Sequence, residues 1–392
     1  MKEGWTYKKL GEVATIVGGS TPKSNIKEFW GGTNYWVTPA NLDGNKYQGA
    51  TPRTITDLAV QKTNLKLLPT GTVLLSSRAP IGKIAITTVP MYCNQGFKNI
   101  ICSNHLINEF VYWYLYGKID YLNSLGKGAT FKEISKKDTE QIEIPVPPIA
   151  EQQRIVDYLN ATFEQIDELK NNAERQLAEA RALFQSALTQ AMQPKPDWQE
   201  KKLKEIGITQ TGTTPSKIDK SNYGEYIPFI RPSEIDFDGC GNIDYNSEMK
   251  LSEKGLSIGR LFKKSSILMV CIGATISKVG FSTQDVSCNQ QINVLYPNDQ
   301  YHYKFIYYAM RNDDFKKKVI KDGTSAQATL PIINKSKWEN LSLFLPNLSE
   351  QQEIAVQLDK LLFSVRELEE INRKTVAECD VLKQAMLRQI FD

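Results

Sequence analysis

Two short polar tripeptides are the parts of this sequence best suited to chemical recognition. Cys93-Asn94-Gln95 and Cys288-Asn289-Gln290 carry side-chain amides, which can donate to and accept from the edge of an adenine base. Each follows a Gly-x-Thr-Pro tetrapeptide, at residues 19–22 and 212–215. Because identical residues in two places can also build the same turn twice, a structural turn is favoured over base recognition by these amides.

The residues for other kinds of chemistry are missing or scattered. The two histidines, His105 and His302, lie far apart in the sequence, and the six cysteines form no CxxC pair, which argues against both a histidine-based triad and a zinc site. The nearest match to a phosphate-binding loop, residues 79–84, lacks both its leading glycine and its hydroxyl. No Asn/Asp-Pro-Pro-aromatic tetrapeptide is present to hold a flipped base. The sequence therefore predicts a chain that is not itself an enzyme and holds neither metal nor cofactor.

Length and composition set the class of protein. A chain of 392 residues, 41% of them hydrophobic, is long enough for two or three domains with cores of their own. No run approaches the ~18 apolar residues of a membrane span, and the first residues do not resemble a signal peptide. We expect a cytoplasmic protein whose cysteines stay reduced.

The chain repeats itself. Leu10, Glu12, Gly19, Thr21 and Pro22 recur 193 residues later, as Leu203, Glu205, Gly212, Thr214 and Pro215. The two Cys-Asn-Gln tripeptides follow at an offset of 195, and Glu-Gln-Gln at residues 151–153 and 350–352 at an offset of 199. The small growth in offset indicates short loop insertions in the second copy.

Each copy has two unlike parts. Residues 1–148 and 194–348 contain short β-branched and aromatic runs broken by Gly and Pro, such as residues 72–75 and 266–270. This pattern predicts two pseudo-repeated globular domains of α/β or α+β class. Within them, the aromatic runs at residues 110–115 and 305–309 are expected to form one buried helix each.

Residues 149–193 and 349–392 are expected to be long helices. Selected positions follow alternating steps of four and three, from Ile155 through Leu169 and Leu183, and from Ile354 through Leu368 and Leu382. Such a repeat is typical of a coiled coil, and the intervening globular domain makes the two helices antiparallel. The alternative is that each helix packs only on its own globular domain. Ser349 and Gln352 have the spacing of a capping box at the second start.

Charge separates the same parts. Residues 1–148 hold 17 basic and 11 acidic residues, and residues 194–348 hold 21 and 17, so that both are net basic. The helical stretches hold 4 basic against 7 acidic residues and 6 against 9. Basic domains are suited to phosphate, whereas acidic helices would be repelled by it and are expected to contact protein.

The order of these parts resembles the specificity subunit of type I restriction–modification enzymes. The resemblance rests on the helix starts at residues 147–156 and 346–355, on the Gly-x-Thr-Pro tetrapeptides and on the Cys-Asn-Gln tripeptides, and it covers essentially the whole chain. It implies two target recognition domains that read the halves of a bipartite DNA target, joined by helices that act as a spacer. It also implies partners that carry the chemistry, with two methyltransferase (modification) subunits on the spacer and restriction subunits attached through them. One departure is that Arg154 has Glu353 as its counterpart.

The two copies serve as an internal control for the DNA contacts. If the half-sites differ, residues shared by both copies are scaffold or phosphate contacts, and base recognition falls where matched loops diverge. The divergent pairs are Thr38 and Arg231, Asn41 and Glu234, Arg78 and Gly273, and Gly96 and Gln291. The predicted DNA-contacting residues are Thr21, Lys23, Thr38, Asn41, Arg78, Lys83, Gln95, Lys127, Thr130, Thr214, Lys217, Arg231, Glu234, Lys278, Gln290, Gln291 and Gln327.

Two other classes of protein compete with this hypothesis. A non-catalytic coiled-coil interaction protein with two ligand-binding domains would not bind DNA in a salt-dependent way. A self-contained DNA enzyme would be active as the purified chain alone.

Overall fold

A computed structural model of the chain describes residues 4–78, 80–128, 132–236, 239–246, 249–323 and 331–392. The chain divides into two compact units. Each unit combines one globular part with one end of each of the two long helices. One unit comprises Met1–Ala173 and Lys374–Asp392, and the other comprises Glu174–Arg373. The boundaries between the units therefore lie within the two long helices, α6 (Ile149–Ala191) and α12 (Leu348–Phe391).

The globular part of the first unit precedes α6. Its elements are β1 (Thr6–Lys9), α1 (Leu10–Val13), β2 (Ala14–Gly18), η1 (Lys27–Phe29), β3 (Trp30–Val37), η2 (Pro39–Asn41), β4 (Tyr47–Gln48), β5 (Thr54–Ile55), α2 (Asp57–Lys62), β6 (Val73–Leu75), β7 (Ile84–Thr87), β8 (Tyr92–Cys93), β9 (Lys98–Cys102), α3 (Asn108–Tyr116), α4 (Ile119–Leu125), α5 (Lys136–Glu140) and β10 (Glu143–Val146). They form sheets of order β2-β9-β6-β7-β4, β5-β3-β8 and β1-β10.

The globular part of the second unit lies between the long helices and repeats this plan. Its elements are β11 (Gln199–Lys202), α7 (Leu203–Ile206), β12 (Gly207–Thr211), η3 (Lys220–Asn222), β13 (Tyr223–Ile230), β14 (Lys250–Leu251), α8 (Glu253–Ile258), β15 (Ile267–Val270), β16 (Val279–Phe281), β17 (Ser287–Cys288), β18 (Ile292–Pro297), α9 (Tyr303–Arg311), α10 (Asp313–Gly323), α11 (Lys335–Glu339) and β19 (Ser342–Leu345). Its sheets have the orders β12-β18-β15-β16, β14-β13-β17 and β11-β19.

The class is α+β, because most strand pairs are antiparallel. Among the strands that the structure describes, the parallel pairs are β3 with β8, β4 with β7 and β13 with β17. The predicted strands at residues 72–75 and 266–270 are β6 and β15, and the predicted buried helices are α3 and α9. No described helix is both long enough and apolar enough to cross a membrane.

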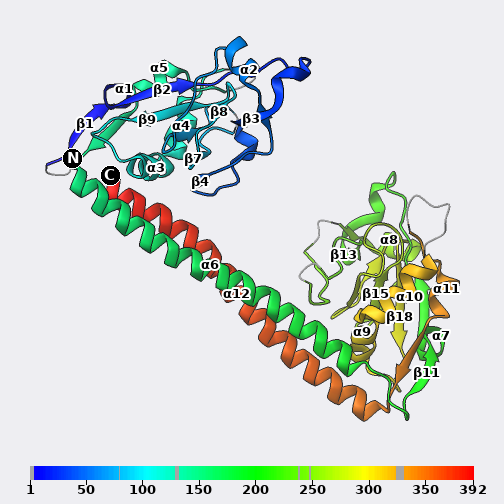
Figure 1. The fold of residues 1–392 in the computed structure, drawn as a ribbon. Helices are drawn as coiled ribbons and strands as arrows, with labels where there is room; N and C mark the ends of the chain where they lie inside the picture. The colour runs from blue at the N-terminus through cyan, green and yellow to red at the C-terminus, as the bar shows by residue number, and fades with distance from the viewer. Residues whose placement is uncertain (1–3, 79, 129–131, 237–238, 247–248, 324–330) are drawn as a thin grey trace. The chain divides into compact units, whose positions relative to one another are not determined.

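Within each unit the long helices run antiparallel and also pack on the globular part. In the first unit, Lys383 pairs with Asp167, and the Nζ of Lys170 lies 2.9 Å from Asp380. In the second unit, the Nε of Arg181 lies 2.5 Å from Glu369. The hydrophobic cores combine helix and globular residues: Phe163 of α6 contacts Trp113 of α3 at 4.7 Å between ring centroids. Both arrangements considered from the sequence therefore occur together (Figure 1).

The predicted phase of the helix contacts is wrong at alternate positions. Leu169 and Leu183 were expected in the seam but are 53% and 59% exposed, whereas Phe163 and Phe184 are 3% and 4% exposed. In α12, Leu368 and Leu382 are likewise exposed. The reason is that the buried stripe follows residues 152, 156, 159, 163 and 166. Ile155, the first predicted position, is also buried, but beyond it the buried stripe shares only every second position with the predicted one.

The long helices are fixed at their starts by buried glutamines from the repeated Glu-Gln-Gln sequence. Gln152 donates to the carbonyl oxygens of Pro147 and His105 at 2.9 and 2.8 Å. Gln351 donates to the carbonyl oxygen of Pro346 at 2.8 Å. The predicted capping box at Ser349 is wrong, because α12 begins earlier: Asn347 Oδ1 accepts from the backbone N–H of Glu350 at 3.0 Å.

Candidate nucleic-acid interface

The Gly-x-Thr-Pro and Cys-Asn-Gln motifs are far apart in the sequence but lie against each other in both copies of the repeat, here called the first half and the second half. In the first half, the backbone N–H of Ser20 donates to the carbonyl oxygen of Cys93 at 3.0 Å, and the Thr21 hydroxyl donates to Gln95 Oε1. In the second half, the backbone N–H of Thr213 donates to the carbonyl oxygen of Cys288 at 2.9 Å. The Thr214 hydroxyl donates to Gln290 Oε1, as Thr21 does to Gln95. We call each pairing of Gly-x-Thr-Pro with Cys-Asn-Gln a loop junction.

The closeness of the two segments explains the glycine that begins each tetrapeptide. A Cβ at Gly19 would lie 2.1 Å from the carbonyl oxygen of Asn94 and 2.4 Å from the sulfur of Cys93. A Cβ at Gly212 would lie 2.1 Å from the carbonyl oxygen of Asn289. Any larger residue would therefore force the loop junction apart.

The cysteine and asparagine of each tripeptide have structural roles. Burial raises the pKa of the Cys93 thiol to about 12, so that it is neutral near pH 7 and packs as a small apolar group. Asn94 Oδ1 accepts from the backbone N–H of Gly96 at 2.9 Å, and Asn289 Oδ1 accepts from that of Gln291 at 3.1 Å. The predicted structural turn at both asparagines is confirmed.

A third segment lies beside each loop junction: residues 38–41 follow β3, and residues 231–234 follow β13. Each of these strands pairs in parallel with the short strand that ends at the cysteine of the loop junction. Thr38 and Asn41, a predicted pair of base contacts, touch each other: Asn41 Oδ1 accepts from both the backbone N–H and the hydroxyl of Thr38 at 2.8 Å. Their counterparts do the same, since the Glu234 carboxylate accepts from the Arg231 backbone N–H at 2.7 Å and from its Nε at 3.1 Å. Glu234 is only 5% exposed, so it orients Arg231 from below the surface.

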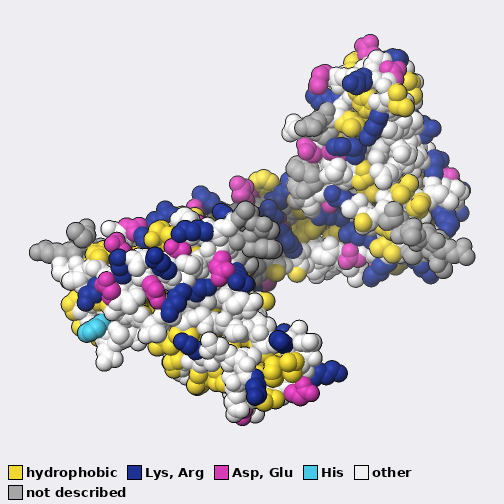
Figure 2. Space-filling view, turned by 90° about the horizontal axis from the view of Figure 1, so that it is seen from above, with side chains coloured by type: hydrophobic (Ala, Val, Ile, Leu, Met, Phe, Trp, Pro, Cys, Tyr) yellow, Lys and Arg dark blue, Asp and Glu magenta, His cyan; other side chains and the backbone are white. Residues whose placement is uncertain are grey.

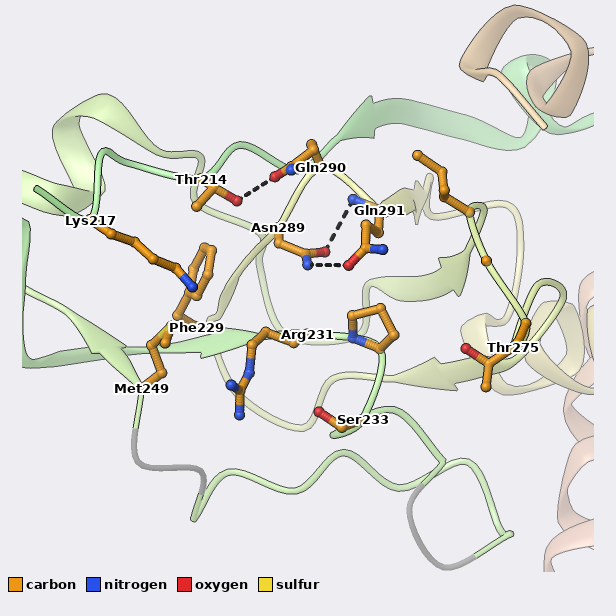
Figure 3. A pocket seen from close by; sticks show the side chains of 14 residues that line it. Thr214, Lys217, Phe229, Arg231, Ser233, Met249, Thr275, Asn289, Gln290 and Gln291 are labelled. Atoms are coloured by element: carbon orange, nitrogen blue, oxygen red, sulfur yellow. Dashed lines mark hydrogen bonds between the residues drawn. The ribbon is translucent and has the colours of Figure 1, made fainter. Parts of the chain in front are cut away.

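A hollow of about 520 Å³ opens beside the second loop junction (Figure 3). Its lining includes five predicted contacts, namely Thr214, Lys217, Arg231, Gln290 and Gln291. It also includes Phe229, Ser233 and Met249, for which the sequence pattern predicts no DNA contact. Glu234 and Lys278 are not part of this lining. The hollow presents amide, hydroxyl, ammonium and guanidinium groups together, the groups that contact base edges and phosphates.

In the first half, several predicted contacts are engaged within the protein. The Lys83 ammonium donates to the carbonyl oxygens of Pro39 and Leu42 at 3.1 and 2.8 Å, which fixes the loop that carries Thr38. The Nε of Arg78 lies 2.8 Å from Glu133, whose other oxygen accepts from Lys98.

The remaining predicted residues differ in exposure and surroundings. Lys127 pairs with Asp138 at 3.0 Å on the surface, and Lys23 is exposed. Lys278 is half-buried. Thr130 and Gln327 lie outside the described residues. Lys and Arg side chains are spread over the face shown in Figure 2, mixed with fewer acidic ones.

Comparisons with known proteins agree on one family. The sequence profile described as "Type I restriction modification DNA specificity domain" matches residues 2–179 and 195–378. The MjaIX specificity subunit of a type I restriction enzyme from Methanocaldococcus jannaschii is 30% identical over 367 residues, which span 87% of this chain and 83% of the relative. The EcoR124I/EcoR124II specificity subunit from Escherichia coli is 33% identical over 167 residues, 41% of each chain.

Solved structures share the fold. The HsdS subunit from Thermoanaerobacter tengcongensis aligns with a TM-score of 0.62 and 20% identity, covering 100% of this chain and 97% of that one. A chain from a structure of type I R-M complex assembly aligns with a TM-score of 0.79 and 20% identity, covering 99% and 98%.

Proposed function

The chain belongs to the family of type I restriction–modification specificity subunits, and from that premise we propose that each loop junction reads one half of a bipartite DNA target. The protein is a non-catalytic subunit that recognises a DNA sequence. The observation that carries the proposal is the hollow beside the second loop junction, which is lined by five of the predicted polar residues. Residues 1–148 and 194–348 are then the two target recognition domains.

Residues that are identical in the two copies of the repeat are proposed to hold the site together and to contact phosphate. Residues that differ between the copies are proposed to recognise the bases. Thr21 and Gln95 bond to each other as Thr214 and Gln290 do, so both pairs are scaffold that also faces phosphate. Lys23, Lys83, Lys127, Lys217 and Lys278 are proposed phosphate contacts. Thr38, Asn41, Arg78, Arg231 and Gln291 are proposed base-reading residues, and Glu234 is proposed to act on base reading by positioning Arg231. Thr130 and Gln327 stay proposed DNA contacts.

Arg231 is the sharpest test of base reading in the second domain. Its guanidinium is oriented by the buried Glu234 carboxylate, and arginine commonly reads guanine. Arg231→Gln should change the preferred base in one half-site by about tenfold in affinity, and leave the other half-site unchanged.

Lys217 provides the matched contrast. Lys217→Ala should weaken binding to all sequences alike and reduce the salt slope by about 0.9. Selection from randomised DNA at several salt concentrations measures both effects. The same sequence preference in the wild type and in Arg231→Gln would contradict the assignment of Arg231.

The long helices are proposed to bind two methyltransferase subunits. Leu169 and Leu382 are exposed in the first unit, and their repeat counterparts Leu368 and Leu183 are exposed in the second. Each unit thus presents the same apolar pair on its helices, and two equivalent surfaces suit two copies of one partner. Restriction subunits would attach through those copies.

Substituting one surface at a time tests this stoichiometry. The double variant Leu169→Glu, Leu382→Glu should bind one methyltransferase subunit, and the variant with all four leucines changed should bind none. Native mass spectrometry of the assembled complex counts the copies. Gln165→Glu, on an exposed position of α6, is the matched charge control. Two copies bound to the four-leucine variant would refute the proposed surface.

We also place the protein in the cytoplasm, where its DNA target is. All six cysteines are free thiols in the structure, as a reducing compartment requires. Fractionation of cells that express the tagged chain tests this location.

A further inference from the structure

We propose that Arg53 reads a base of the first half-site, and that Met249 occupies the equivalent place in the second domain without a donor. This inference rests on the proposed function, since it concerns the same DNA site. It adds a specificity-determining position that the repeat comparison did not reveal.

The equivalence of Arg53 and Met249 is fixed by a backbone hydrogen bond. The N–H of Trp36 donates to the carbonyl oxygen of Arg53 at 3.2 Å, and the N–H of Phe229 donates to that of Met249 at 3.2 Å. Trp36 and Phe229 are matched positions of the repeat. Met249 lines the hollow with Arg231 and Lys217, and Figure 3 shows it beside Phe229 and Arg231. Arg53 therefore stands at the corresponding edge of the first loop junction.

The guanidinium of Arg53 lies over an aromatic ring. Its guanidinium carbon lies 3.6 Å from the ring centroid of Trp30 and 5.3 Å from that of Trp36. Both rings are tied to the loop that carries Thr21, because Trp30 Nε1 donates to the Lys23 carbonyl oxygen at 3.3 Å and Trp36 Nε1 donates to that of Ser20 at 3.2 Å. The stack is thus a built part of the first loop junction.

Stacking orients the guanidinium and leaves its edge available. Arg53 is exposed, and no carboxylate of the described residues lies within ion-pair distance of it. A planar guanidinium fixed by its face keeps its N–H donors in one plane, which suits the two acceptors of a guanine. Lysine has the charge but lacks this geometry.

The second domain offers the same platform with a different occupant. Tyr223 takes the place of Trp30, because both pair with the neighbouring strand at matched positions, Leu251 and Ile55. Tyr223 is anchored to its own tetrapeptide, since its hydroxyl donates to the Pro215 carbonyl oxygen at 2.8 Å. Met249 packs on the same apolar cluster as Tyr223, lines a hollow together with it, and cannot donate a hydrogen bond. The two domains therefore differ in chemistry at one equivalent point.

Loss of the guanidinium gives the first test. The full chain with its methyltransferase subunits is used for selection from DNA randomised in both half-sites. Arg53→Met should lower discrimination at one base pair of the first half-site by about tenfold. Arg53→Lys should keep overall affinity but lose that discrimination. The unchanged second half-site reports that the variants fold, and Arg154→Met, an exposed arginine on α6, is the matched control.

The reciprocal variant is a gain-of-function test. Met249→Arg should add a guanine preference at one position of the second half-site. If the wild type selects a bipartite sequence and Arg53→Met selects the same one with the same discrimination, the role of Arg53 is refuted and the proposed function stands. An equal loss of affinity for all sequences would make Arg53 a phosphate contact and also refute it. If the wild type selects no sequence, the proposed function itself fails.

Discussion

Gln152 Oε1 accepts a hydrogen bond from the backbone N–H of Ile107 at 2.9 Å, across 45 residues of sequence. Gln351 makes the same bond to the backbone N–H of His302 at 2.9 Å. Both glutamine side chains are buried, and each also donates to a carbonyl oxygen of the segment that precedes its helix. One residue type therefore joins the start of each long helix to the loop before a buried aromatic helix.

Removing this amide should destabilise the unit that contains it. Gln152→Met leaves a backbone N–H and two carbonyl oxygens without their partner, and we expect a loss of about 3 kcal/mol. Hydrogen exchange measured by mass spectrometry resolves the two units, and protection should fall in α3 and the start of α6. Gln153→Met, at the next and exposed position, should change stability by less than about 0.5 kcal/mol. Equal protection in the two variants would contradict the prediction.

Adjacent glycines at the first loop junction should respond in opposite ways. A Cβ at Gly18 would make only an ordinary contact, 3.9 Å from the carbonyl oxygen of Phe97, whereas one at Gly19 would meet Asn94 at 2.1 Å. Gly18→Ala should be neutral or slightly stabilising. Gly19→Ala should abolish selection of the first half-site while the second is kept. Thermal unfolding and DNA selection together check this pair.

Much of this architecture could be predicted from the sequence, because it depends on repeats and on local pattern. Both long helices, the buried aromatic helices and the turn at each Asn are predicted by patterns between residues that are close in the sequence. The phase of the helix seam could not be predicted, because leucines such as Leu169 and Leu183 also fit a repeat of four and three. Only the packing of Phe163 and Phe184 decides between the two phases.

The site was recognised only in part for a related reason. The motifs of each loop junction were apparent, but their contact depends on strands pairing across more than 70 residues. Arg53 was missed because its segment and that of Met249 share no residues that align them. Their equivalence lies in a backbone hydrogen bond, which no side chain specifies.

Two serines of the second unit occupy positions that the first unit gives to glycine. Ser277 has a φ of 72° and Ser265 a φ of 71°, where the repeat places Gly82 at 92° and Gly71 at 84°. Left-handed backbone costs a residue with a Cβ about 1–2 kcal/mol. We therefore expect Ser277→Gly to stabilise the second unit by about 0.5–1 kcal/mol. Ser257→Gly, within α8, should instead destabilise it by a similar amount. Urea unfolding compares the two.

The two units carry different charges at an equivalent contact between a buried aromatic helix and a long helix. Lys304 pairs with Asp359, whereas the first unit has Glu109, which accepts from Asn160 Nδ2 at 2.8 Å. Lys304→Glu should destabilise the second unit by about 1 kcal/mol, because two carboxylates then meet. Adding Asp359→Asn should restore stability by recreating the first unit's pair. A double-mutant cycle with no coupling would show that the two positions act independently.

Acid should weaken the first unit through Glu109. Partial burial acts to raise its pKa, but hydrogen bonds from Lys46, Asn160 and Tyr47 outweigh burial and hold the pKa below its ordinary value of 4.5. The folded state therefore binds this proton less readily than the unfolded state, so the contribution to stability is present above about pH 4.5 and is lost as the pH falls through the folded pKa. Glu109→Gln should flatten this part of the unfolding profile. An identical slope in wild type and variant would exclude Glu109 as the cause.

The division of the chain into units has a consequence for the order of folding during synthesis. The first unit includes Lys374–Asp392, and Phe391 packs against Phe110 with 5.5 Å between ring centroids. Its core therefore combines residues translated early with residues translated after the entire second unit. Until α12 leaves the ribosome, the apolar faces of α3 and α6 in the first unit lack part of their covering. The second unit is contiguous from Glu174 to Arg373. We therefore expect it to fold first, the reverse of the usual order in which domains mature from the amino terminus.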